Sequence, residues 1–365
     1  MTKEEFRQIA HSGGRITIHT VTQADGRRAY STAFEHCRPC AVAIFAVHVL
    51  PPGVPVGTAR LGGLGSPIDH GPVPGNLMVF IATDSQGMWG AECPRCEAYW
   101  RSGSPSKCCV SCGLRAQPHD FLTAAHAAYL QEYCALFAKV QSAPDGDHVI
   151  DFDAVADAVD SVEKPPFYYA EESQQNQFTC TACGTVVDIL GKFGYCSRCG
   201  TRNDLQELET KLNAIRAKIN AVDANREDCV RDAVSAFDST VGQYVKELVT
   251  HIPMTQARRN RLDNSRYHNV YAVQSELKDT FDIDIFEGIN DGDKRFAAKM
   301  FLRRHVYEHN GGEADEAYIE QSGDNTVRLK QALREDQESA HRTVGVVMRM
   351  AKNLHDGFHG ILPPS

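Results

Sequence analysis

The spacing of apolar residues divides the chain into a β-rich first part and a helical last part. Residues 15–21 alternate apolar and polar side chains, while residues 41–50 and 77–81 are short apolar runs, and each of these patterns predicts a strand. The intervening stretch, 51–75, is dense in Pro and Gly and predicts loops and turns. We therefore expect a β-rich domain over residues 1–90.

From residue 204 onward, apolar residues recur three and four positions apart in two successive seams. The first seam comprises Leu205, Leu208, Leu212, Ile215, Ile219 and Val222, and the second comprises Val230, Val234, Phe237, Val241, Tyr244 and Leu248. Such a seam packs either inside one chain or between two chains as a coiled coil, and these spans fall short of the three to four heptads usual for a coiled coil. Both alternatives stay open at this point.

Further helical patterns complete the last part of the chain. Pro253 ends the helix expected over 226–250, and three more helices are expected over 268–281, 293–309 and 336–358. Four helices are the number of an all-α bundle.

The segment between the β-rich part and the helical part contains one expected helix and a stretch that is typical of a linker. A helix is expected over 121–140, and the acidic, Pro-containing stretch from Ala143 to Pro166 predicts a linker around one short helix.

Eight of the thirteen cysteines form two groups with the same internal spacing. Each group has two Cys-x-x-Cys pairs separated by twelve residues, and the members are Cys93, Cys96, Cys109 and Cys112, then Cys180, Cys183, Cys196 and Cys199. A Cys-x-x-Cys turn offers two thiolates to one face of a tetrahedral Zn²⁺, and a hairpin brings up the second pair. All four positions are cysteine, so no ligand position remains for a catalytic water, and we expect two structural zinc ions in two zinc ribbons. Cys108 could replace Cys109, but the repeated spacing favours Cys109.

Composition bears on the compartment. Residues 1–6 show no apolar signal core, and the longest apolar run, 40–50, contains His48 and is too short to span a bilayer. Metal-bound thiolates in a reducing cytoplasm therefore fit the cysteines better than a disulfide framework does. We expect a cytoplasmic protein with no membrane segment, and a length of 365 residues allows two or three domains.

Charge is unevenly spread along the chain. The net charge of -9 argues against a nucleic-acid footprint over the whole molecule. Two basic runs stand out, namely Arg258, Arg259, Arg261 and Arg266 in a loop-like stretch, and Lys294, Arg295, Lys299, Arg303 and Arg304 on one predicted helix. Either run alone could be a solvated surface, but together they favour phosphate binding near the end of that helix.

The end of the predicted helix 293–309 carries the densest chemistry. Residues 303–312 contain two Arg, two His, a Glu and an Asn, and their Asn-Gly-Gly terminus is a helix stop. Arg offers a planar charged fork suited to phosphate, and His can transfer a proton near neutral pH. The pattern predicts chemistry on a phosphodiester. A second pair of comparable spacing, Arg349 and His355, lacks the helix stop and the polar residue directly after the Arg.

Residues 226–362 resemble a HEPN domain, a helical family whose motif is Arg, usually a polar residue, three or more residues, and then His. The motif here is Arg304-His305-Val306-Tyr307-Glu308-His309. The segments Phe237-Asp238, 284–288 and 315–319 resemble elements that accompany the motif in prokaryotic members. The resemblance covers about the last third of the chain.

The resemblance implies RNA cleavage without a catalytic metal, by a dimer in which two motifs face each other. His309 would exchange a proton with the ribose 2′-OH or the leaving oxygen, and Arg304 would stabilise the charge on the phosphorane. The products would be 2′,3′-cyclic phosphate and 5′-OH ends. Many prokaryotic members act in toxin or phage-defence systems, and the resemblance implies the same setting here.

Six further residues complete the predicted site. His305 and Glu308 could orient it, and Asn310 could contact phosphate or cap the helix; for these three a purely structural role is an equal alternative. Arg303, Lys299 and Arg295 are the candidate substrate-binding residues.

The sequence thus predicts a multidomain α+β protein with RNA as its partner. The expected parts are a β-rich domain (1–90), zinc ribbon 1 (91–118), a helix and linker (119–172), zinc ribbon 2 (173–203), a heptad helix (204–225) and an all-α HEPN-like bundle (226–362). The first hypothesis is a homodimeric ribonuclease, aided by the heptad helix, whose ribbons recognise nucleic acid or a protein trigger. The alternative is a non-catalytic zinc-ribbon nucleic-acid-binding or adaptor protein whose bundle only dimerises. A third, weaker hypothesis places a catalytic or sensor function in the first domain, at His36, Cys37 and Cys40.

Overall fold

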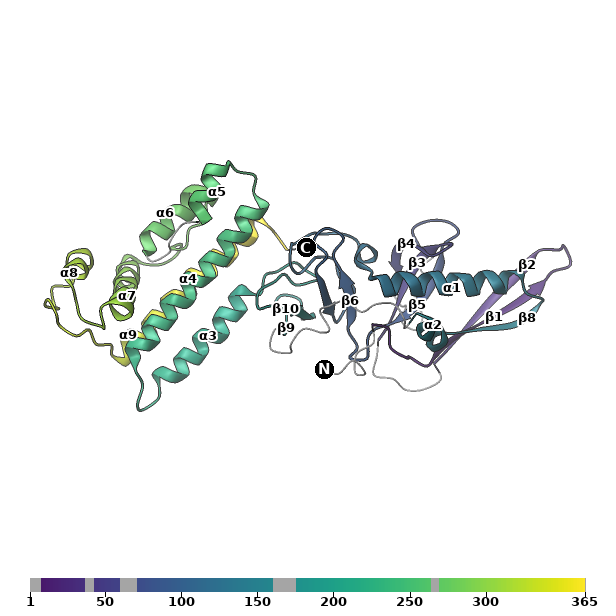
Figure 1. The fold of residues 1–365 in the computed structure, drawn as a ribbon, viewed down its shortest axis with the longest axis horizontal. Coiled ribbons are helices and arrows are strands. Elements are labelled where there is room, and N and C mark those ends of the chain that lie inside the picture. The colour runs from purple at the N-terminus through teal and green to yellow at the C-terminus, as the bar shows by residue number, and fades with distance from the viewer. Residues whose placement is uncertain (1–7, 37–42, 60–70, 160–174, 264–268, 365) are drawn as a thin grey trace. The chain divides into compact units, whose positions relative to one another are not determined.

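The computed structural model describes residues 8–36, 43–59, 71–159, 175–263 and 269–364 (Figure 1). The chain forms two compact units, one ending at Thr201 and the other running from Arg202 to Pro364. Every described strand lies in the first unit, and the second is helical. A β-rich N-terminal region, two four-cysteine clusters and a helical C-terminal region are therefore confirmed.

Two three-stranded antiparallel sheets form the N-terminal part of the first unit. Their strand orders are β2-β1-β8 and β4-β3-β5. The strands are β1 (Gly14–Thr22), β2 (Arg28–His36), β3 (Ile44–Leu50), β4 (Val54–Ala59), β5 (Leu77–Ala82) and β8 (Gly146–Asp151). Strands β1, β3 and β5 lie where the sequence predicts strands, because their inward side chains form the core of this part.

Three strands of these two sheets, β2, β4 and β8, lie where the sequence predicted none. β4 falls within the Pro- and Gly-rich stretch that was expected to contain only loops, and β8 begins inside the expected linker. β8 pairs with β1 from Thr20↔Gly146 to Arg15↔Asp151. Its sequence has little apolar alternation of its own, so the hydrogen bonds to β1 make it a strand.

A third sheet carries both cysteine groups. Its order is β6-β7-β10-β9, with β6 (Trp89–Glu92), β7 (Tyr99–Ser102), β9 (Gln175–Thr179) and β10 (Val186–Leu190). The hairpin β6–β7 belongs to the first ribbon and the hairpin β9–β10 to the second. Because β7 and β10 pair at the centre, the two ribbons share one continuous sheet. We call residues 89–115 and 175–201 the ribbon body.

The helix α1 (Ala124–Ser142) completes the core of the first unit. It follows a short 3₁₀ turn (Pro118–Phe121) and starts three residues later than expected, because Thr123 caps it by accepting a hydrogen bond from the His126 N–H. It contacts β4, β5, β8 and the helix α2 (Phe152–Ala158). The His126 ring stacks on Trp89 of β6 at 4.7 Å between centroids, so one core serves all three sheets.

The second unit contains α3 (Asp204–Ile219), α4 (Arg226–His251), α5 (Gln256–Asp263), α6 (Val270–Phe281), α7 (Asp291–His309), α8 (Glu316–Ser322) and α9 (Gln337–Ile361). α4 is central and packs against α3, α7 and α9 (Figure 1). The helices expected after residue 226 coincide with α4, α6, α7 and α9 within a few residues. Among the described helices, none combines the length and apolar composition needed to cross a bilayer.

The first heptad seam is filled within the chain itself. Leu208, Leu212, Ile215 and Ile219 are buried, and α3 contacts both α4 and α9. Val222 lies beyond the helix and is 97% exposed. Intramolecular packing is therefore the alternative that the structure adopts, and the seam offers no surface for a two-chain coiled coil.

The basic stretch after Pro253 is a helix, not the expected loop. Arg259 of α5 donates to the Val249 carbonyl, and Arg261 pairs with Glu276 at 2.9 Å, so both side chains are held by neighbouring helices. Arg266 lies outside the described residues.

Candidate functional site

The sulfur atoms of each cysteine group converge on one point. All four lie within 4.8 Å of one another in both groups. The Sγ–Sγ distances are 3.7 Å for Cys93–Cys112 and Cys96–Cys109, and 3.6 Å for Cys180–Cys199 and Cys183–Cys196. A tetrahedral zinc with Zn–S bonds of about 2.3 Å has sulfur–sulfur edges of roughly 3.8 Å. Each group therefore fits one zinc ion.

Cys109, and not Cys108, belongs to the first group, as the repeated spacing predicted. Cys108 is buried outside the group, and burial raises the pKa of its thiol to about 12. It is a neutral side chain of the interior.

All four Cys-x-x-Cys turns have the same backbone hydrogen bonds. The carbonyl of the first cysteine accepts the N–H four residues later, from Glu97, Gly113, Gly184 and Gly200 respectively, and its N–H donates to the carbonyl five residues later. The residue after the second cysteine is always in the left-handed region, with φ between 58° and 76°. Three of these residues are Gly and suit that conformation; Glu97 does not.

The two ribbons are related by a local pseudo-two-fold axis. Each cysteine of the second group follows its counterpart by the same 87 positions that separate Arg101 from Asp188. Arg101 and Asp188 lie directly opposite each other in the β7–β10 pair. Counterparts that face each other across an antiparallel pair mark a two-fold axis between them.

A buried ionic contact lies on this axis. Arg101 donates to Asp188 from Nε at 2.9 Å and to Asp84 from Nη1 at 3.0 Å, and all three side chains are almost fully buried. Nothing in the spacing of the chain indicated this triad, because its members come from three separate segments.

In the second unit, Arg304 lies near the end of α7 with its guanidinium facing α4. Its Nη2 is 2.9 Å from Glu308 Oε2 and 4.0 Å from Asp238 Oδ2, and its Nε donates to Ser235 Oγ at 3.2 Å. The side chain is 10% exposed. Arg304 is thus held in one orientation by three oxygen-bearing groups.

His309 is far more open than Arg304. Its side chain is 56% exposed and its Nε2 lies 3.8 Å from Glu308 Oε2. The rings of His305 and His309, one turn apart, have centroids 4.7 Å apart. Glu308 therefore links Arg304 and His309, and His305 lines the same exposed strip of α7.

The other predicted basic residues of α7 have different surroundings. Arg303 donates to Tyr318 (3.0 Å), Glu335 (2.8 Å) and Asp324 (3.1 Å), and Lys299 is 3.6 Å from Asp324. This network packs α7 against α8 and the start of α9. Arg295 is exposed, but nine helical positions place it about 14 Å from Arg304 along the axis.

Asn310 is the C-cap of α7, and its side chain forms a hydrogen bond close by in the sequence. Its Nδ2 donates to Asp315 Oδ2 at 2.5 Å, and Asp315 in turn caps α8. Of its two predicted roles, the structure accounts for the capping role.

The Arg349/His355 pair is not a site of the same kind. Arg349 pairs with Asp293 at 2.6 Å, while His355 is hydrogen-bonded to the Tyr244 hydroxyl at 2.6 Å. Burial lowers the pKa of His355 to about 4, so it is neutral at physiological pH. The two side chains belong to separate contacts, and that of Arg349 is half exposed.

The α5 arginines do not extend the Arg304 segment. Arg259 is anchored at Val249, whereas Arg304 contacts α4 at Ser235 and Asp238. Val249 lies eleven positions after Asp238, which corresponds to about 16 Å along α4. Arg259 is therefore not part of a phosphate surface shared with Arg304.

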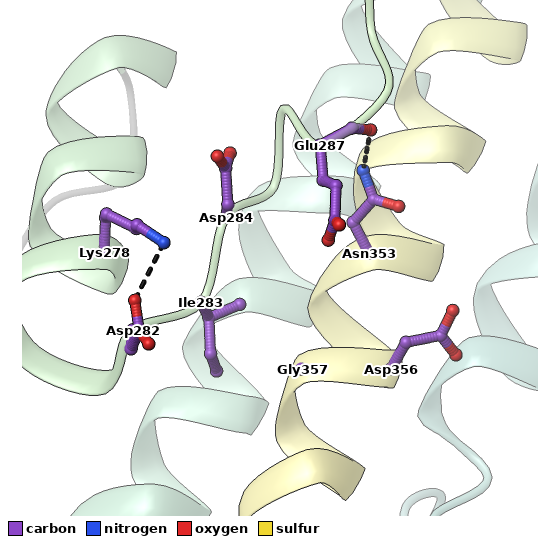
Figure 2. Close-up of a pocket in the computed structure, with 8 residues that line it drawn as sticks. All are labelled: Lys278, Asp282, Ile283, Asp284, Glu287, Asn353, Asp356 and Gly357. Carbon is purple, nitrogen blue, oxygen red and sulfur yellow. Dashed lines mark hydrogen bonds and ion pairs between the residues drawn. The ribbon is translucent and has the colours of Figure 1, made fainter.

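A cavity of about 390 Å³ lies between α9 and the loop joining α6 to α7 (Figure 2). Four carboxylates line it, and two of them have partners: Asp282 pairs with Lys278 at 2.8 Å, and Asp284 accepts from Gln274 at 2.8 Å. Asn353 donates to the Glu287 carbonyl, as Figure 2 shows. The acidic lining would repel a phosphate, and no residue of the 303–312 segment belongs to it.

Comparison with models of protein families, with curated proteins and with solved structures gives no match. The HEPN resemblance therefore rests only on the motif and the accompanying segments quoted above. Asp238, which was part of that resemblance, does lie beside Arg304; Ser235 was not predicted, and its distance of 69 positions from Arg304 left no local signal. Cys37 and Cys40 lie outside the described residues, and His36 is the exposed last residue of β2.

Proposed function

We propose that this chain is a metal-independent endoribonuclease of the HEPN type, with Arg304 and His309 as its catalytic pair. The observation that supports this most is the fixed Arg304 guanidinium and an exposed histidine, both in contact with Glu308, at the same helix end. A guanidinium held by Glu308, Asp238 and Ser235 needs no reorganisation to meet a phosphate. An exposed imidazole can reach a ribose.

The chemistry needs two proton-transferring groups. His309 takes the proton of the 2′-OH, the 2′ oxygen forms a bond to phosphorus, and the bond from phosphorus to the 5′ oxygen breaks. The leaving 5′ oxygen takes a proton from a second imidazole, which a second copy of the chain supplies in a composite dimeric site. Arg304 stabilises the negative charge on the phosphorane oxygens.

Each remaining predicted residue has a place in this proposal. Glu308 orients Arg304 and His309, and His305 borders the exposed strip on which the second copy would dock. We assign Arg303, Lys299 and Asn310 to the packing of α7 and α8, and Arg295 to an outlying contact with RNA. Two structural zinc ions hold the ribbon body, which recognises nucleic acid or a protein trigger. The HEPN resemblance favours a toxin or phage-defence setting.

The test is RNA cleavage by zinc-loaded protein in buffer free of Mg²⁺ and Mn²⁺. We expect cleavage to yield 2′,3′-cyclic phosphate and 5′-OH ends, and to stop when the cleaved nucleotide carries 2′-H. Arg304→Ala and His309→Ala should each lower the rate by about 10²–10³-fold. Arg334→Ala and His341→Ala, which change an Arg and a His outside the site, serve as matched controls.

Intact RNA at every protein concentration would contradict the proposal. So would cleavage that survives both site substitutions, or cleavage of the 2′-H substrate. Strong chelators are avoided in this assay, because they would also remove zinc from the ribbon body.

A second function, nucleic-acid binding without cleavage, is favoured by the surface of the ribbon body. Arg95, Lys107 and Arg198 are exposed there, in a chain whose net charge is -9. This function predicts salt-sensitive binding of DNA or RNA that His309→Ala leaves unchanged. Binding that Arg95→Ala and Arg198→Ala do not weaken would exclude it.

A further inference from the structure

We infer that the two cysteine groups form one coupled metal-binding unit, in which each ribbon holds a metal-binding turn of the other. The inference requires that the groups bind metal, as proposed above, but not that the chain cleaves RNA. It predicts that a metal ion bound in one group raises the affinity of the other group.

The main observation is a pair of reciprocal hydrogen bonds. The carbonyl of Val110, inside the turn Cys109–Cys112, accepts the N–H of Tyr195 at 2.8 Å. The carbonyl of Ser197, inside the turn Cys196–Cys199, accepts the N–H of Cys108 at 2.9 Å. Cys108 and Tyr195 each directly precede the first cysteine of their own turn. Each bond thus joins the entry of one turn to the middle of the other.

Two side-chain contacts reinforce this junction. The hydroxyls of Ser102, at the end of β7, and Ser197 are 2.7 Å apart and buried. Arg101 and Asp188 form their buried ion pair across the same pair of strands. If the first ribbon unfolded, Asp188 would lose its cation, and if the second unfolded, Arg101 would keep only one of its two buried carboxylate partners.

Because of these contacts, the folding of the turns of one site is coupled to the folding of the turns of the other. A four-cysteine site forms only when its turns are ordered, so metal affinity includes the free energy of folding those turns. The first metal ion orders its own turns and, through the reciprocal bonds and the β7–β10 pair, the turn of the other group. The second ion then binds a site that is already formed, which is positive coupling without any bridging ligand.

The direct test uses the unaltered protein and native mass spectrometry at one Zn²⁺ per two sites. Two independent sites leave at least about half of the chains with a single ion at half-saturation, and a tenfold coupling lowers this share to about a quarter. We expect a share of a quarter or less, with most chains carrying either no ion or two ions.

Ligand substitutions give a second measurement. Cys183→Ser and Cys96→Ser each disable one group, and we expect the remaining group to bind Co²⁺ roughly tenfold or more weakly, as followed by the visible absorption of the tetrathiolate complex. Cys229→Ala, which changes a cysteine of the helical unit, is the control for altered thiol content and should leave both affinities unchanged.

A pair of serines separates coupling from the ligands themselves. Both Ser197 and Ser111 lie inside a second Cys-x-x-Cys turn, but only Ser197 pairs with Ser102, while Ser111 is exposed. Ser197→Ala should keep two ions per chain and lower the coupling about twofold to fivefold, and Ser111→Ala should change nothing.

The inference is overturned if the singly loaded share is half or more and both ligand variants keep the remaining affinity within twofold. Equal effects of Ser197→Ala and Ser111→Ala on the coupling would likewise contradict the inference, because they would show that the contact between Ser197 and Ser102 does not transmit it. None of these outcomes depends on RNA cleavage, so the inference and the proposed function can fail separately.

Discussion

The ribbon body and the end of α7 hold charged groups in opposite ways. In the ribbon body, eight sulfurs point inward onto two closed centres, and a repeated backbone pattern fixes every turn. At the end of α7, Arg304 and His309 are five positions apart, so their side chains leave the helix about 140° apart and connect only through Glu308. In the ribbon body the chain itself supplies all four ligands of each centre, which suits a structural role. The arrangement at the end of α7 leaves more than half of His309 exposed to solvent and joins it to the buried Arg304 through the partly exposed Glu308, which suits binding.

The largest expected difference between the two units is their response to metal removal. Structural zinc contributes on the order of 10 kcal/mol to folding, so a strong chelator should unfold the ribbon body and leave the second unit helical. Both tryptophans of the chain, Trp89 and Trp100, are buried in the ribbon body, and their fluorescence reports on the first unit and not on the second. Far-UV circular dichroism follows the helices. If the chelator changed both the fluorescence and the circular dichroism of the folded protein, or neither of them, the expected difference between the two units would be contradicted.

Adjacent arginines of α7 should differ in what they stabilise. Arg303→Ala leaves Glu335, whose side chain is 0% exposed, without its cation and leaves Asp324 with Lys299 alone, so we expect a loss of about 3–5 kcal/mol in the free energy of unfolding. Arg304→Ala should cost only about 1 kcal/mol, because Glu308 is 36% exposed and can be hydrated. Urea denaturation followed by circular dichroism measures both. Equal losses would show that Arg304 is part of the interior and not of an open site.

Acid should weaken both units through one buried histidine in each. Burial lowers the pKa of His126 to about 3 and that of His355 to about 4, against about 6.5 in the unfolded chain. Between these values only the unfolded state takes up the proton, so stability falls as pH falls below about 6.5, by roughly 1.4 kcal/mol per pH unit for each histidine.

At pH 5 each unit should therefore have lost about 2 kcal/mol, as measured by denaturation at pH 7 and pH 5 with tryptophan fluorescence and circular dichroism as separate signals. His355→Gln should flatten the pH dependence of the helical signal and leave that of the fluorescence signal unchanged. The same slope in the helical signal of wild type and variant would be inconsistent with a neutral, buried His355.

The smallest effect concerns the one turn that departs from the repeat. Glu97 and Gly184 are counterparts, both with positive φ, and no atom lies within 4 Å of the Cβ that alanine would add at Gly184. Glu97→Gly should stabilise the ribbon body by about 1 kcal/mol, and Gly184→Ala should destabilise it by a similar amount. Both are read from tryptophan fluorescence at a fixed zinc concentration. Two changes of the same sign would mean that the turns are not equivalent.

The sequence predicted the cysteine groups in full because each ligand is set by its distance from the next. It could not predict that β7 pairs with β10, since no local pattern distinguishes two separate ribbons from two ribbons in one sheet. The long helices followed from apolar periodicity, whereas β8 depends on its partner β1 and had no sufficient pattern of its own.

The Arg304 segment was only half predictable for a related reason. Helical spacing placed Arg304, Glu308 and His309 on one helix end, but the residues that orient Arg304 come from α4, which is remote in sequence. Nothing local distinguished Arg303 from Arg304. The difference between them depends on which carboxylates α8, α9 and their connection bring to each face of α7.

The Arg101–Asp188 pair also means that the two ribbons cannot be identical at their axis. Two identical ribbons associated about a true two-fold axis would bring two copies of the same residue together on that axis, and two buried arginines or two buried aspartates would repel each other. Two copies joined in one gene escape this rule, because each can mutate alone. The opposite charges on the axis are therefore a change open to a duplicated and fused ribbon, and closed to a dimer of identical chains.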